Sequence, residues 1–133
     1  MRKLLRVNLS NGTTKEDEIP NKIALDYVGG RGFGSKYLYD EVHLGTEPLS
    51  KDNKLLVVAG PLAGTNAQSV SKWAVITRSP LTNTFTRSYG GGDFGAWLKW
   101  AGFELIILGG KAAKPAYLSI TDGTYEILEA RDS

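Results

Sequence analysis

The stretch that decides the fold reads Ser88-Tyr89-Gly90-Gly91-Gly92-Asp93-Phe94-Gly95. It follows a run typical of a strand, Thr84–Tyr89, and leads into a run typical of a helix, Asp93–Ala101. A glycine loop between a strand and a helix exposes backbone N–H groups that can bind an anion. We expect the Asp93 carboxylate to cap the helix and Gly102 to end it. The sequence therefore predicts an ordered junction suited to an anion.

On either side of this junction, strand-like runs dominate the chain. Asn11-Gly12 follows the alternating run Leu4–Leu9 and predicts a hairpin with a type I′ turn. Asp122-Gly123 predicts a second and clearer hairpin. The remaining predicted strands are short apolar or β-branched runs, Leu55–Ala59, Trp73–Thr77, Thr84–Thr86 and Leu105–Leu108.

Helical patterns are fewer. They cover Ser35–Val42 and Asp93–Ala101. In the second helix an apolar face, expected to pack on a sheet, combines Phe94, Trp97, Leu98 and Ala101. The expected fold is a strand-rich α+β domain, with mostly antiparallel sheets and two short helices.

Composition restricts the possible functions. The chain has 133 residues and a net charge of +2, which suits one domain. It has no cysteine, which excludes disulfides, cysteine-ligated zinc, iron–sulfur clusters and thiol catalysis on this chain. Basic residues are not clustered as in nucleic-acid-binding proteins, and no apolar run approaches the roughly 18 residues of a membrane span. We expect a cytoplasmic protein that binds neither nucleic acid nor membrane, and in which the one histidine, His43, is not catalytic.

A second glycine cluster reads Gly29-Gly30-Arg31-Gly32-Phe33-Gly34-Ser35-Lys36. As a phosphate-binding P-loop it has Ser35 and Lys36 in the reverse order, and as a dinucleotide fingerprint it has Ser35 in place of the third glycine. The preceding run Ile23–Val28 also looks helical. A tight turn that caps a helix is favoured, although it leaves Arg31 and Lys36 without a role.

Two loops are expected to line one cleft. They are Gly60–Ser71, which follows a predicted buried strand, and Ser88–Asp93. Lys72 lies directly after the first loop and could pair with a phosphate as a point charge. An ordinary solvent-facing lysine explains this residue equally well, so both readings stay open on the residues alone.

Short motifs along nearly the whole chain occur in an order that resembles the N-terminal domain of the aldehyde ferredoxin oxidoreductases. Each motif alone is weak, but the ordered set is highly specific. The motifs are Arg6–Leu9, Gly29–Gly32, Gly60–Thr65, Ser79–Thr82, Gly91–Gly95, Leu98–Lys99, Ala101–Phe103, Gly110–Ala112 and Lys114–Pro115.

The resemblance implies a saddle-like, sheet-rich base that carries a tungsten- or molybdenum-bis-pterin cofactor with magnesium. Lys72 matches the residue that pairs with the cofactor phosphate, commonly arginine in the family. Tyr89 matches a residue whose backbone carbonyl binds a phosphate-bridging magnesium ion, and Gly91 matches a glycine close to the cofactor. The expected cofactor-binding set is Arg31, Lys72, Tyr89, Gly90, Gly91 and Gly92.

The resemblance further implies oxidation of aldehydes to carboxylic acids with ferredoxin as electron acceptor. The family's [4Fe–4S] cluster is expected elsewhere, because its cysteines lie beyond this chain. Residues 1–133 are thus expected to be a single, incomplete domain, inactive without missing C-terminal domains or a larger subunit that carries the cluster. The alternative is a stand-alone binding or interaction module that kept the fold and lost the cofactor. An unpaired sheet edge would favour self-association of such a module into a homo-oligomer.

Overall fold

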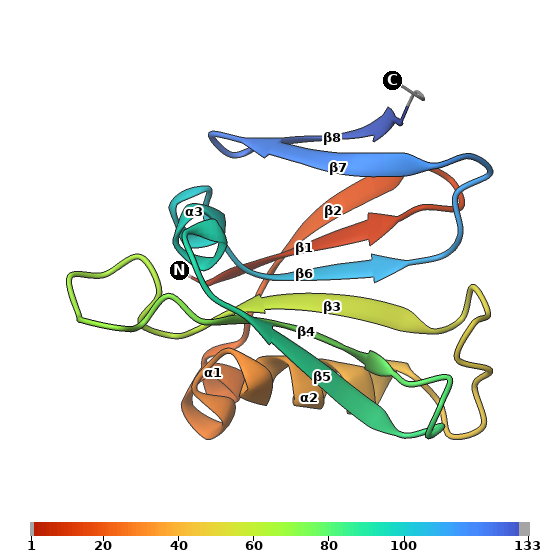
Figure 1. The fold of residues 1–133 in the computed structure, drawn as a ribbon, viewed down its shortest axis with the longest axis horizontal. Helices are drawn as coiled ribbons and strands as arrows, with labels where there is room; N and C mark the ends of the chain where they lie inside the picture. Colours follow the sequence, from red (N-terminus) through yellow and green to blue (C-terminus); the bar gives the residue numbers. More distant parts are fainter. Residues whose placement is uncertain (1, 131–133) are drawn as a thin grey trace.

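The computed structural model describes residues 2–130 and is built around one six-stranded sheet, which Figure 1 shows. Its strand order is β2-β1-β6-β3-β4-β5. Strands β1 and β6 are parallel, and the other neighbours are antiparallel. The bounds are β1 Lys3–Asn8, β2 Thr13–Glu18, β3 Lys54–Ala59, β4 Trp73–Arg78, β5 Phe85–Gly90 and β6 Phe103–Gly109. The expected strand-rich, mostly antiparallel α+β fold is confirmed.

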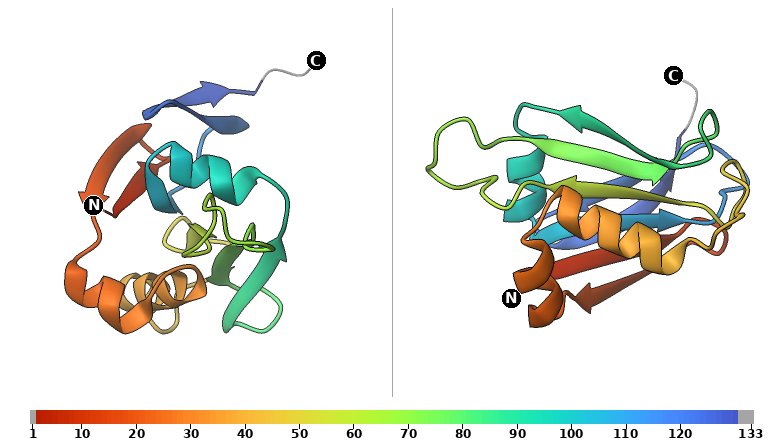
Figure 2. Two further views of the ribbon diagram at one scale, coloured as in Figure 1. Left: turned by 90° about the vertical axis from the view of Figure 1, so that its left-hand side faces the viewer. Right: turned by 90° about the horizontal axis from the view of Figure 1, so that it is seen from below.

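Both faces of the sheet are covered, as Figure 2 shows. Helices α1 (Asn21–Tyr27) and α2 (Arg31–Glu41) lie on one face. Helix α3 (Phe94–Trp100) and the hairpin of β7 (Ala116–Thr121) and β8 (Thr124–Glu129) lie on the other. Within residues 2–130, no helix has the length and apolar character to cross a membrane.

Two apolar cores result, because successive residues of a strand point to opposite faces of the sheet. In β1, Leu4 belongs to the core under α1 and α2, whereas Leu5 belongs to the core under α3 and the hairpin. The first core also contains Phe33, Tyr37, Leu38, Leu56, Val58, Ile76 and Leu105, and the second Val7, Ala59, Leu98, Phe103 and Ile106. Burial on both faces fixes the register of the central strands, since a shift by one residue would exchange the two cores.

The two predicted hairpins differ in their turns. Asp122 and Gly123 have φ of 48° and 81°, as a type I′ turn requires. In the first hairpin only Gly12 has a positive φ, so the predicted type I′ turn at Asn11-Gly12 is wrong. The Asn11 side-chain oxygen instead accepts hydrogen bonds from the Thr13 N–H and hydroxyl, which stabilise a longer loop.

The two predicted helices are confirmed, and α1 is a third. Helix α2 begins at Arg31, four residues before the predicted start at Ser35, and therefore includes Gly32 and Gly34. A Cβ atom at Gly32 would collide with the Tyr27 carbonyl, and one at Gly34 with the Ile76 side chain. These glycines serve close packing in a helix preceded by another helix, which excludes the P-loop and dinucleotide readings.

The ends and the face of α3 agree with prediction only in part. Gly102 ends the helix with φ of 98°, and its N–H donates to the Lys99 carbonyl. The predicted cap by the Asp93 carboxylate is wrong, because Asp93 already has helical dihedral angles and its side chain makes no capping bond. Leu98 and Ala101 pack on the core as expected, but Trp97 is 63% exposed.

An ion cluster joins the C-terminal end of α2 to the sheet. The Arg6 guanidinium donates to both carboxylate oxygens of Glu41, at 2.9 and 2.7 Å, and its Nε donates to Asp17 at 2.7 Å. Lys54 Nζ also donates to Glu41, at 2.6 Å. Burial alone would raise the pKa of Glu41, but the bonds from Arg6 and Lys54 outweigh it and hold the pKa below its usual value.

Replacement of Glu41 should therefore destabilise the fold and change its acid sensitivity. We expect Glu41→Gln to lower the free energy of unfolding by about 2 kcal/mol at neutral pH, because Arg6 and Lys54 lose a half-buried partner. Because the pKa of Glu41 is lower in the folded than in the unfolded chain, its ionised carboxylate stabilises the folded state at pH values above the ordinary glutamate pKa of about 4.3. This stabilisation is lost as the pH falls below that value and through the lowered pKa of the folded state. Urea unfolding at several pH values should show a smaller loss of stability in acid for Glu41→Gln than for wild type. The control Asp40→Asn, at an exposed helical pair with Lys36, should change stability by less than about 0.5 kcal/mol.

Candidate functional site

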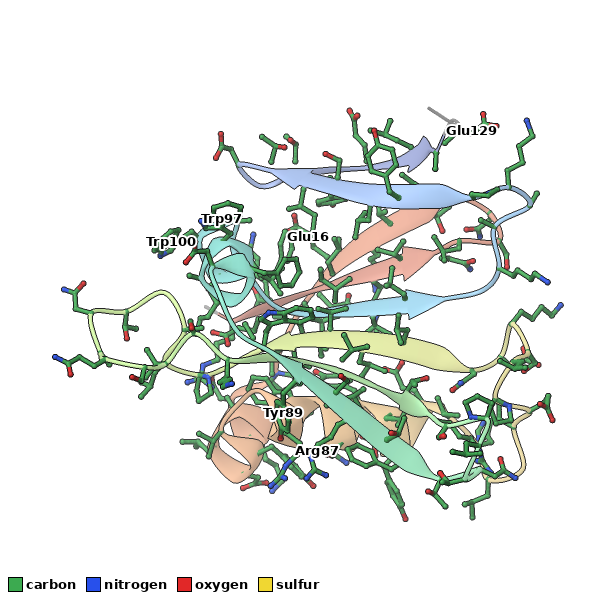
Figure 3. The ribbon with its side chains drawn as sticks, viewed as in Figure 1. Glu16, Arg87, Tyr89, Trp97, Trp100 and Glu129 are labelled. Carbon is green, nitrogen blue, oxygen red and sulfur yellow. The ribbon has the colours of Figure 1, made fainter. Side chains whose placement is uncertain are left out.

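A cleft of about 340 Å³ lies where β3 ends and β4 begins. It brings together three of the predicted cofactor-binding residues, Arg31, Lys72 and Tyr89 (Tyr89 is labelled in Figure 3). The other lining residues are Gly29, Gly30, Val58, Gly60, Pro61, Trp73 and Ala74. The two predicted loops thus share a cleft, the first by its starting residues Gly60 and Pro61 and the second by Tyr89.

One wall is the turn between α1 and α2, which has a strained backbone. Val28 has φ of 66° and ψ of −51°, and the Gly29 N–H donates to the Tyr27 carbonyl across it at 2.7 Å. A γ-turn with this positive φ is rare, and a β-branched residue there is strained. Arg2 supports the turn by donating to the Val28 carbonyl at 2.7 Å. The turn directs the N-terminus of α2, the positive end of its dipole, to the cleft.

The opposite wall is the loop that follows β3. The Gly60 N–H donates to the Lys72 carbonyl at 2.9 Å, and a Cβ atom at Gly60 would lie only 2.8 Å from that oxygen. This close approach fixes the backbone at Lys72. Lys99 Nζ donates to the Pro61 carbonyl at 2.9 Å and pairs with Glu104 at 3.0 Å, which ties the loop to α3. The loop is therefore held by a backbone hydrogen bond to the start of β4 and by the Lys99 side chain of α3.

The cleft is positively charged. Arg31 and Lys72 are exposed, and neither takes part in a salt bridge among residues 2–130. None of the ten lining residues carries a carboxylate. Together with the α2 N-terminus, the two cations favour an anionic ligand such as a phosphate group.

Among residues 2–130, the backbone carbonyl of Tyr89 takes no part in strand pairing. The Ser79 N–H donates to the Thr84 carbonyl at 2.8 Å, so Ser79 and Thr84 form a hydrogen-bonded pair. From this pair onward, non-hydrogen-bonded and hydrogen-bonded pairs of residues alternate along the antiparallel strands β4 and β5. In this alternation Tyr89, opposite Ala74, is in a non-bonded pair. Its N–H and C=O groups therefore point away from β4, and β5 is the last strand of the sheet.

The three consecutive glycines do not line the cleft, and each has a different environment. A Cβ atom at Gly90 would overlap the Trp73 indole, and Gly92 has φ of 79°, so packing and backbone conformation account for these two. Gly91 has neither constraint, since a Cβ atom there would meet nothing within 4 Å. Its carbonyl accepts a bond from Trp73 Nε1 at 3.1 Å. Nothing among residues 2–130 explains glycine at position 91.

Sequence reasoning missed the contribution of α2. It placed the helix N-terminus for an anion after Gly90–Gly92, whereas the cleft is lined by Gly29 and Gly30 at the start of α2. The signal was present in the helical pattern before Gly29, which places a helix–turn–helix junction there. Within residues 2–130, no group of three or more His, Cys, Asp or Glu side chains is placed to hold a metal ion.

Strain at the α1–α2 turn leads to a prediction. Val28→Gly should raise the free energy of unfolding by about 1 kcal/mol. Glycine adopts this positive φ without strain, and the strain relieved exceeds the extra chain entropy that glycine loses on folding. Val28→Ala is the matched control, since it shortens the same exposed side chain but keeps Cβ. Chemical denaturation should show a gain for glycine and none for alanine. An equal gain in both variants would mean that exposure of the valine, rather than backbone strain, limits stability.

Comparison with known proteins agrees with the fold and the motifs. The family model described as aldehyde ferredoxin oxidoreductase, N-terminal domain, matches residues 4–133. The chain is 45% identical over 128 residues to the tungsten-containing aldehyde ferredoxin oxidoreductase of Pyrococcus horikoshii, with 96% of this chain and 21% of that protein covered. It is 37% identical over 131 residues to the WOR-like subunit of an aliphatic sulfonate oxidoreductase of Pyrococcus furiosus, with the same shares covered.

A solved structure supports the same relationship. The active-site complex BamBC of benzoyl coenzyme A reductase superposes with a TM-score of 0.94 at 35% identity, covering 96% of this chain and 19% of that chain. The chain spans about a fifth of the length of the curated relatives it matches. It belongs to the family of aldehyde ferredoxin oxidoreductase N-terminal domains.

Proposed function

We propose that residues 1–133 hold the phosphate end of a tungsten- or molybdenum-pterin cofactor within a larger oxidoreductase. The observation that carries this proposal is the convergence of Arg31, Lys72 and the N-terminus of α2 on one cleft whose lining has no carboxylate. The tungsten-containing relatives support a tungsten cofactor. The donor set suits the group, because phosphates pair with cations and with helix N-termini.

Four of the six predicted residues, Lys72, Arg31, Tyr89 and Gly91, have a definite part in this proposal. Lys72 supplies a point charge where the family commonly has arginine, and Arg31 supplies a second cation. The Tyr89 carbonyl, free at the sheet edge, would bind a magnesium ion that bridges phosphates. Gly91 leaves open space beside the loop, as the close approach of a bulky ligand requires. A cleft of about 340 Å³ is at the small end of ligand sites and suits a phosphate with part of a pterin.

The chain is one part of the proposed enzyme and is not catalytic alone. When bound, the metal–pterin group would supply the redox chemistry that oxidises an aldehyde to a carboxylic acid, with ferredoxin as the electron acceptor. The residues of this chain would bind and orient that group. The chain covers 21% of the tungsten-containing relative, and further domains or a larger subunit would supply the iron–sulfur cluster and the remaining cofactor contacts.

Loss of the Lys72 charge should weaken cofactor binding in the complete assembly. We expect Lys72→Ala to reduce the tungsten or molybdenum and pterin that co-purify by roughly tenfold, as for a lost charge-assisted contact. Lys72→Arg should retain both, since it keeps the charge and restores the family's residue. The measurement is metal and pterin content by mass spectrometry after co-expression with the cluster-bearing subunit.

Lys51→Ala is the matched control, because Lys51 is an exposed lysine outside the cleft. Unchanged metal and pterin content in Lys72→Ala would exclude the phosphate role of Lys72. The absence of both from the wild-type assembly would instead favour the alternative, a binding module without the cofactor.

The consecutive glycines separate stability from cofactor binding. Gly90→Ala should cost about 2 kcal/mol, because its Cβ overlaps the Trp73 indole. Gly91→Ala should change stability by less than about 0.5 kcal/mol, yet lower the pterin content of the assembly. Thermal unfolding of the chain and pterin analysis of the assembly measure the two effects. Normal pterin content in Gly91→Ala would show that the open side of Gly91 is not used by the cofactor.

A further inference from the structure

The two edges of the six-stranded sheet differ in how they are protected. Edge strand β2 carries charged residues at four consecutive positions, 15–18, a pattern that discourages the addition of another strand. Edge strand β5 carries a single charge, on Arg87. The alternation that frees the Tyr89 backbone also frees Phe85 and Arg87, so their N–H and C=O groups point away from β4. Strand β5 thus offers an unprotected edge.

An apolar groove of about 610 Å³ lies beside this edge, between β5 and α2. Tyr39 and Leu44, which both line the groove, are 85% and 98% exposed, so the groove presents large apolar side chains to solvent. Phe85 closes the groove on the β5 side. Its other apolar lining residues are Tyr27, Leu38 and Val42. Side chains of an added strand would reach this groove on the α2 face.

The charges around the groove are positive. None of its lining residues carries a carboxylate. Within the described part of the chain, Arg78 donates only to neutral oxygens, those of the Asn83 side chain at 2.9 Å and the His43 backbone at 3.2 Å. Arg87 takes part in no salt bridge among residues 2–130 and lies 5.7 Å from the Tyr89 ring centroid (Figure 3). Lys36 is neutralised by Asp40 at 2.8 Å.

These charges select the kind of partner. A second copy of the chain would bring its own Arg87 and Arg78 to the same surface, and like charges on paired strands are destabilising. An acidic segment would neutralise both cations. The free backbone groups require that segment to be extended, since hydrogen bonds to a strand edge are made by another strand.

We propose that β5 binds an extended acidic segment of another polypeptide as an added strand. Its backbone pairs with Phe85 and Arg87 and leaves the Tyr89 carbonyl unpaired. Residues directly opposite each other share a face of the sheet, so an acidic side chain lies against Arg87. If the partner strand runs antiparallel to β5, the residue two positions after this acidic residue lies opposite Phe85. An apolar side chain at that position enters the groove. The preferred motif is therefore acidic–any–apolar.

A peptide titration tests this surface. The first probe is a short threonine-rich peptide with glutamate and leucine at the motif positions, and the second has lysine in place of glutamate. The third is the glutamate peptide with N-methyl groups on the residues whose N–H groups would face β5. Nitrogen-15 NMR spectra of the chain of residues 1–133 should shift at Phe85–Arg87 and the groove with the glutamate peptide. The amides of Phe85 and Arg87 should also become protected from hydrogen exchange. The lysine and N-methylated peptides should not bind.

Arg87→Glu should weaken the glutamate peptide by about tenfold and allow the lysine peptide to bind, while Arg87→Gln should have an intermediate effect. Lys111→Glu, an equal charge change on an exposed residue outside the groove, is the matched control. Equal binding of the glutamate and lysine peptides, or shifts outside β5 and the groove, would overturn the proposal. So would a dimer of the free chain, seen by light scattering, in which the Phe85 and Arg87 amides are already protected.

Discussion

The position of α2 on the sheet is the constraint on which the rest of the structure depends. At Gly34 the helix lies so close to Ile76 that any Cβ atom would collide with this side chain. At its other end, Glu41 is held by Arg6 of β1 and Lys54 of β3. Because a helix is a rigid rod, these two anchors also determine where its N-terminus lies. That N-terminus forms a wall of the cationic cleft.

Three of the ten residues that line the cleft are glycines, Gly29, Gly30 and Gly60, whose only atoms are backbone. Gly30 is the N-cap of α2, the Gly60 N–H donates to the Lys72 carbonyl, and the Tyr89 carbonyl points away from β4 at the sheet edge. Side chains add the two cations, Arg31 and Lys72. A site of this kind provides charge and fixed dipoles rather than acid–base groups, which agrees with the proposed role of holding a cofactor that carries its own chemistry. The strained turn at Val28 beside it fits the tendency of backbone strain to occur at ligand sites.

Local patterns predicted much of the fold. Short apolar runs such as Leu55–Ala59 gave confirmed strands, and Asp122-Gly123 gave a confirmed turn, because these features depend on neighbouring residues. The failures arose where a distant or competing contact prevailed. The Asn11 side chain accepts hydrogen bonds from Thr13 and changes the first turn, and Asp93 precedes α3 in a helical conformation without a capping bond from its carboxylate. The start of α2 was missed because glycine disfavours helices until tertiary packing requires it.

By itself, the sequence determined the composition of the two sheet faces, the family and the residue types available for an anion site. Its ordered motifs were sufficient for the family because they extend over nearly the whole chain. Only the tertiary structure decided that Arg31 joins Lys72 and Tyr89 in the cleft expected between the two loops, that Gly90–Gly92 lie outside it, and that β5 is an open edge. These facts depend on the order of strands and on the docking of α2. Contacts between residues far apart in the chain set both, and no local pattern encodes them.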